Sequence, residues 1–126
     1  MTIWLKFVAI SALLGVPMEI QARVLRMWLY TPPRMVVFNV IAIVGLLFGT
    51  IAWLTRGLPV PAQFLSGAAV GIVYETLNFA GLNAWVFPGD RLGPLKGKTA
   101  LTIGVGLAWG VYPVLTNLLV KLLGQG

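Results

Sequence analysis

The chain has 126 residues, of which 59% are hydrophobic and only 10% are charged, whereas soluble domains average about 45–50% apolar residues. Its formal net charge of +6 comes from basic residues that flank apolar segments, a pattern that favours membrane topology over nucleic-acid binding. The sequence contains no His and no Cys, which excludes most metal sites, haem ligation and thiol catalysis, so no cofactor is expected.

Four hydrophobic helices are predicted, and together they make a single all-α membrane domain. The first covers residues 3–29 and is ended by Thr31-Pro32-Pro33. The second covers residues 35–55. The third begins at Pro61, which suits a first helical position, and continues to residue 85, and the fourth covers residues 99–122. Each is long enough to cross a hydrocarbon core of about 30 Å.

The basic residues divide the loops into two sides of the membrane. One side holds Arg23, Arg26, Arg34, Arg91, Lys96 and Lys98. The other side holds Lys6, Arg56 and Lys121. The positive-inside rule therefore predicts that the first and third loops face the cytoplasm of a bacterial inner membrane and that both termini lie outside. Trp28, Tyr30 and Trp85 lie near predicted helix ends and are interpreted as interface anchors.

The two halves of the chain are similar enough to predict a tandem repeat of one helical hairpin, residues 1–57 and 58–126. The corresponding groups are Ser11, Gly15 and Glu19 with Gly67, Gly71 and Glu75; Trp28-x-Tyr30 with Trp85-x-Phe87; and Gly45 and Gly49 with Gly106 and Gly110. Residues four apart share a helix face, and small residues let helices approach closely. The small members of these groups are therefore predicted to pack helices together.

Glu19 and Glu75 are two of only three acidic residues, and both lie inside predicted helices. A carboxylate in hydrocarbon costs several kcal/mol unless it is protonated, paired or hydrated, so both should face the bundle interior. The functional hypothesis is a paired intramembrane site for a proton, a cation or a polar head group, with Tyr74, Asn78 and Arg23 beside it. The structural alternative is that Glu19 pairs with Arg23 and Glu75 bonds Asn78, which would only stitch the bundle together.

One stretch of the chain resembles a known family. The order Glu75, Asn78, Trp85-x-Phe87, a basic loop and then Trp109-Gly110 is similar to a motif of small bacterial transporter permeases of the CmpB type. The resemblance covers residues 75–110, with a fainter echo over residues 19–30. An Asn-Arg-Gly stretch typical of that family is absent here. The resemblance implies a transport-like membrane protein and no particular substrate.

Three functions are compatible with these features. The first is a transporter or permease-like module in which Glu19 and Glu75 form the coupling or substrate site, working as a homo-oligomer through a Gly-x3-Gly face. The second is an accessory subunit of a larger membrane complex. The third is an enzyme acting on an isoprenoid or carotenoid lipid, in which a protonated carboxyl donates to a double bond. Transport without catalysis is the leading prediction, and membrane lipid is the expected partner.

Overall fold

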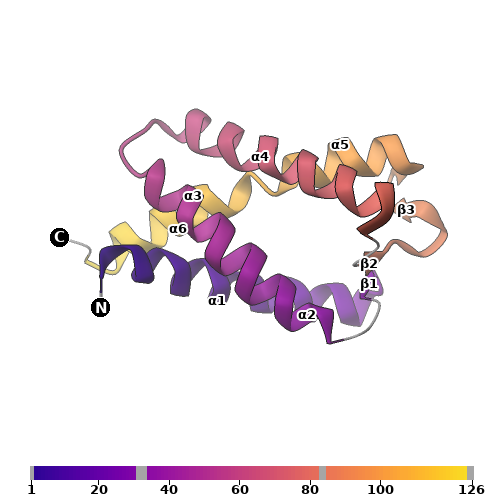
Figure 1. Cartoon of the computed structure of the whole chain (residues 1–126), viewed down its shortest axis with the longest axis horizontal. Helices are drawn as coiled ribbons and strands as arrows, with labels where there is room; N and C mark the ends of the chain where they lie inside the picture. Colours follow the sequence, from indigo (N-terminus) through magenta and orange to yellow (C-terminus); the bar gives the residue numbers. More distant parts are fainter. Residues whose placement is uncertain (1, 31–33, 83–84, 125–126) are drawn as a thin grey trace.

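The computed structural model describes residues 2–30, 34–82 and 85–124. This part of the chain is mostly helical, which confirms the all-α class. Figure 1 shows the helices running along the long axis of the molecule, with the two chain ends close together at one end and short strands at the other. The strands are an addition to the all-helical prediction.

The helices form two hairpins. Hairpin 1 consists of α1 (Ile3–Leu25) and the helical segment Met35–Leu54, which pack against each other. Hairpin 2 consists of α4 (Val60–Leu77) and the helical segment Lys98–Leu122, which also pack against each other. The two hairpins contact each other chiefly at the end of the molecule that carries the chain termini. There the C-terminal part of the segment Lys98–Leu122 packs against both helices of hairpin 1.

The second helical segment of each hairpin is irregular. The pieces are α2 (Met35–Phe38), the π-helical η1 (Asn39–Phe48) and α3 (Gly49–Leu54) in hairpin 1, and α5 (Lys98–Ala108) and α6 (Val111–Leu122) in hairpin 2. The break between α5 and α6 falls at Trp109 and Gly110. Pro113 lies four residues after Trp109 and has no N–H to donate to the Trp109 carbonyl. By contrast, α1 continues through Pro17.

Two helices end earlier than the sequence predicts. The first ends at Leu25 instead of residue 29, because Arg26 adopts a left-handed conformation with φ of 53°. The third ends at Leu77 instead of residue 85, and a π-helical turn, η2 (Asn78–Leu82), follows it. Within that turn Gly81 has φ of 155°, which glycine accepts and other residues rarely do. The predicted stop at residues 31–33 lies outside the described residues.

Short strands occupy the loops at the end opposite the termini. The strand β1 (Leu29–Tyr30) pairs antiparallel with β2 (Trp85–Val86), and this pairing joins the two hairpins. The strands β3 (Arg91–Leu92) and β4 (Leu95–Lys96) make a small hairpin before α5. A 3₁₀ turn, η3 (Pro88–Asp90), lies between β2 and β3.

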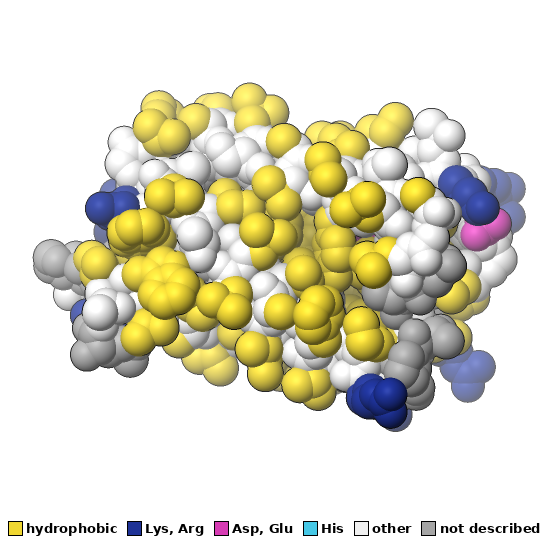
Figure 2. Space-filling view, in the orientation of Figure 1, with side chains coloured by type: hydrophobic (Ala, Val, Ile, Leu, Met, Phe, Trp, Pro, Cys, Tyr) yellow, Lys and Arg dark blue, Asp and Glu magenta, His cyan; other side chains and the backbone are white. Residues whose placement is uncertain are grey.

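Three helical segments are long and apolar enough to cross a membrane: Ile3–Leu25, Met35–Leu54 and Lys98–Leu122. Large apolar side chains on the outer surface are exposed, for example Leu13 at 68% and Val24 at 74%. Figure 2 shows hydrophobic side chains spread over the face in view and Lys and Arg gathered toward its two ends. This surface fits a membrane protein, since lipid and not water would contact the apolar side chains.

Glycines make close helix contacts inside each hairpin. In hairpin 1, a Cβ built on Gly49 would lie 2.6 Å from the Cα of Val8. In hairpin 2, a Cβ on Gly71 would collide with the Gly106 carbonyl oxygen and the Trp109 side chain. The remaining predicted packing glycines also meet a neighbouring helix of their own hairpin: Gly15, Gly45, Gly67, Gly106 and Gly110.

The Ser11 hydroxyl adds to the packing of hairpin 1, because it donates a 2.5 Å hydrogen bond to the Val44 carbonyl. The Gly-x3-Gly faces are thus filled within one chain. Homo-oligomerisation through such a face stays a prediction.

Replacing Gly71 by Ala tests this packing. We expect Gly71→Ala to lower the free energy of unfolding by about 1–3 kcal/mol, because the added methyl would overlap the Gly106 carbonyl oxygen and the Trp109 side chain. Gly57→Ala is the matched control, since a Cβ at Gly57 meets nothing within 4 Å, and its effect should stay within about 0.5 kcal/mol. Thermal unfolding in detergent, followed by circular dichroism, measures both. Equal stabilities of the two variants would contradict the assignment.

Candidate binding site

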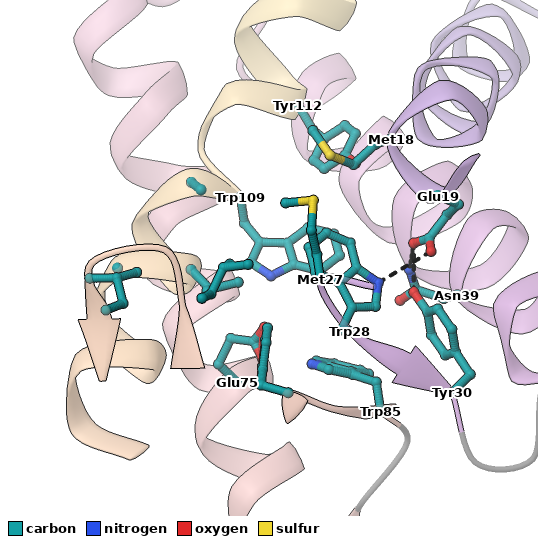
Figure 3. A pocket seen from close by; sticks show the side chains of 16 residues that line it. Met18, Glu19, Met27, Trp28, Tyr30, Asn39, Glu75, Trp85, Trp109 and Tyr112 are labelled. Atoms are coloured by element: carbon teal, nitrogen blue, oxygen red, sulfur yellow. Dashed lines mark hydrogen bonds between the residues drawn. The ribbon is translucent and has the colours of Figure 1, made fainter. Parts of the chain in front are cut away.

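A cavity of about 220 Å³ lies between the two hairpins. Both Glu19 of α1 and Glu75 of α4 line it, so the fold brings the two buried carboxyls to one space (Figure 3). The other lining residues are Met18, Met27, Trp28, Tyr30, Asn39, Trp85, Phe87, Leu92, Leu95, Gly104, Val105, Ala108, Trp109 and Tyr112. Most of the wall is therefore aromatic or aliphatic.

Glu19 is fully engaged by neutral hydrogen-bond donors. Its Oε1 accepts from the Tyr30 hydroxyl at 2.5 Å and from the Asn39 Nδ2 at 2.9 Å, and its Oε2 accepts from the Trp28 indole at 3.3 Å. Arg23, one turn later on α1, is exposed and forms no ion pair with Glu19 in the part of the chain that the structure describes. The structural alternative of a Glu19–Arg23 pair is therefore not the observed arrangement.

The hydrogen bonds around Glu19 also reach hairpin 2. The Oδ1 of Asn39 accepts a 2.9 Å hydrogen bond from the Tyr74 hydroxyl of α4, so both ends of the Asn39 amide are fixed. Burial, followed by the hydrogen bond to Glu19 and its charge, raises the pKa of the Tyr30 phenol far above its usual value. The Tyr30 hydroxyl therefore keeps its proton and remains a donor to Glu19.

Glu75 is in the opposite situation. Its side chain is 1% exposed, and its Oε2 has no hydrogen-bond partner among the described residues. The indoles of Trp85 and Trp109 are its neighbouring polar groups, but the Trp109 Nε1 also lacks a partner within the described chain. A buried carboxyl oxygen without a partner is costly, which makes this the polar group of the cavity wall that a ligand would satisfy.

Asn78, predicted as a neighbour of Glu75, has a different task. Its side-chain Nδ2 donates to the Trp85 carbonyl at 3.0 Å, and its Oδ1 accepts from the Trp85 N–H at 3.3 Å. No hydrogen bond joins it to Glu75 in the described part of the chain. Asn78 therefore holds the start of β2 and, with it, the Trp85 ring beside the cavity.

The aromatic rings of the wall hold one another in place. The Tyr74 ring lies between Trp85 and Trp109, with centroid distances of 4.7 Å and 5.5 Å. Trp28 packs edge-on against Phe87 at 6.1 Å. Trp28, Tyr30 and Trp85 thus contribute to the cavity and to its hydrogen bonds, and Trp85 is only 5% exposed. Their role as interface anchors stays a prediction.

Two important residues of this site are absent from the predicted set. Asn39 is a polar residue within a long apolar run, and that isolation is the signal that could have identified it. Trp109 is part of the motif that resembles the CmpB-type permeases, but the sequence predicts no role for it in the site. Among the described residues, no group of three or more His, Cys, Asp or Glu side chains could hold a metal ion.

Comparison with protein-family models, with curated proteins and with solved structures finds no match to this chain. The resemblance to CmpB-type permeases therefore stays a prediction from the residues named above.

The contrast between the two glutamates predicts opposite effects on stability. We expect Glu19→Met to lower the free energy of unfolding by about 2–4 kcal/mol, because one buried and two partly buried donors lose their acceptor. Glu75→Met should be neutral or stabilising, since it replaces an unsatisfied polar group with an apolar one of similar length. Thermal unfolding of the two variants in the same detergent measures the difference. A larger loss of stability for Glu75→Met would refute the assignment of the two roles.

Proposed function

We propose that the protein is a transporter or permease-like membrane module whose substrate binds in the cavity between the two hairpins. Glu75 supplies the polar contact to that substrate, and the aromatic and aliphatic wall receives its apolar part. The observation that carries the proposal is the Glu75 Oε2 atom, which is buried in the cavity wall and has no partner among the residues that the structure describes. Pockets with a mostly apolar lining and one or a few polar groups are typical of small-molecule sites.

Glu19 has a positioning role in this proposal. Its hydrogen bonds to Trp28, Tyr30 and Asn39 shape one wall of the cavity, and the Asn39–Tyr74 bond connects that wall to hairpin 2. The substrate would then contact Glu75 directly. It would not contact Glu19 itself but the side chains that are hydrogen-bonded to Glu19. In this proposal the two carboxyls of the predicted site have different roles: Glu19 is structural and Glu75 binds the substrate.

The membrane topology of the proposal has four spans. The helix α4 runs beside α5 and contacts it, which supports a place in the bilayer for α4 as well as for the three longer segments. The basic loops between the helices of each hairpin would face the cytoplasm of a bacterial inner membrane, and both termini would lie outside. Gln63 and Glu75 are polar residues of α4, and both side chains are buried within the chain.

A duplicated hairpin is supported by the pairing of β1 with β2. In the proposed repeat Trp28-x-Tyr30 corresponds to Trp85-x-Phe87, so Leu29 corresponds to Val86. These two corresponding residues face each other in the antiparallel pair. Such a register is expected for two copies related by a two-fold axis through that point. On either side of it, Trp28 contacts Phe87 and Tyr30 contacts Trp85.

The cavity can be tested for a natural occupant. The protein is purified from its native membrane in the mildest detergent that extracts it, and the small molecules released on denaturation are identified by mass spectrometry. Wild type should carry a compound that falls at least tenfold in Ala108→Phe, since Ala108 lines the cavity and the added ring would fill it. Leu13→Phe is the control, because Leu13 is on the outer face of α1.

Transport is tested with the same compound. Proteoliposomes containing wild type should move it, and Glu75→Gln should slow the flux at least tenfold. In the mass-spectrometric experiment, release of the same compounds in the same amounts from wild type, Ala108→Phe and Leu13→Phe would contradict the assignment of the cavity. Unchanged flux in Glu75→Gln would remove Glu75 from the mechanism.

A further inference from the structure

We infer that the cavity accepts a lipophilic organic cation, of the quaternary ammonium class, with its charge against the Glu75 carboxylate and its apolar groups against the aromatic wall. This inference rests on the proposed function and names the substrate class of the same site. It follows from the charges that line the cavity, from the chemistry of its wall and from the position of its opening.

The charge of the cavity wall is unbalanced. Glu19 and Glu75 both line the cavity, whereas no Lys or Arg is among the described residues that line it. The charge on Glu19 is distributed over three neutral donors, whereas Glu75 has the indoles of Trp85 and Trp109 beside it and an Oε2 that lacks a partner among the described residues. A cationic ligand would give Glu75 the partner that a buried carboxylate needs, while an anionic ligand would add a third negative group.

The wall suits an organic cation better than a metal ion. Ca²⁺ and Mg²⁺ bind six or more oxygen ligands, but donors already occupy the oxygens of Glu19, so among the described lining residues Glu75 alone has a carboxyl oxygen without a partner. Trp28, Trp85 and Trp109 line the same space. Aromatic side chains attract cations through their π faces, and quaternary ammonium groups, which have no N–H to satisfy, are bound in such cages.

The opening of the cavity indicates that the ligand arrives through the bilayer. Met18 of α1 and Ala108 at the end of α5 both line the cavity and are exposed residues. Both residues belong to helical segments that are long and apolar enough to cross a membrane. The basic residues of the loops are exposed at the end of the molecule and do not line the cavity. A cation soluble in lipid would therefore avoid their repulsion.

Phenyltrimethylammonium and its uncharged isostere tert-butylbenzene test the inference, because they have the same shape and differ in charge. Binding to the intact protein in lipid nanodiscs is measured from the ligand-dependent rise in unfolding temperature, with tryptophan emission as the signal. We expect wild type to bind the cation at least tenfold more tightly than the isostere, at equal concentration in the bilayer. Glu75→Gln should abolish that preference, whereas Glu75→Asp should retain it.

Asp90→Asn is the matched control. It removes one carboxylate from an exposed turn that does not line the cavity, so the preference for the cation should be unchanged. Equal binding of the two probes, or a preference that survives in Glu75→Gln, would overturn the cation assignment and leave the cavity as a site for neutral ligands. Binding of neither probe would also overturn the cation assignment. Whether the cavity is a binding site at all is tested separately, by the mass-spectrometric search for its natural occupant.

Discussion

A carboxyl group in an apolar interior needs a partner, and the two glutamates of this chain meet that requirement in opposite ways. Glu19 accepts hydrogen bonds from three side chains that follow it in the sequence, and these bonds draw the loop after α1 inward. Glu75 has one oxygen at the cavity wall without a partner among the described residues. The fold thus satisfies the first carboxyl internally, and we propose an external partner for the second. The two positions that the predicted repeat aligns therefore have different surroundings.

The cavity depends on how the hairpins are joined. Glycine contacts close each hairpin tightly, and the two hairpins meet through α3 and α6 at one end and through the β1–β2 pair at the other. The cavity lies between these two junctions, and side chains such as Trp28, Trp109 and Tyr112 line it. The irregular segments lie at this level as well, since η1 begins at Asn39 and α5 ends just before Trp109.

The sequence was sufficient to predict the membrane class, the helical segments and the burial of two carboxyls, because each rests on a local signal: apolar length, proline and glycine positions, or charge within an apolar run. It was not sufficient to predict where the tryptophans point. Trp28 and Trp85 follow helix ends, and only the pairing of β1 with β2, a contact between residues far apart in the chain, turns them inward. The set of donors to Glu19 could not be predicted for the same reason, since Asn39 belongs to the next helix.

The central claim is that Glu75, and not Glu19, is the carboxyl that meets the ligand. Infrared difference spectroscopy on addition of phenyltrimethylammonium measures this most directly, because binding changes the carboxyl stretching bands of the group that is contacted. The account predicts a difference band that is present in wild type and in Glu19→Gln and is lost in Glu75→Gln. A band that is lost in Glu19→Gln and kept in Glu75→Gln would contradict it.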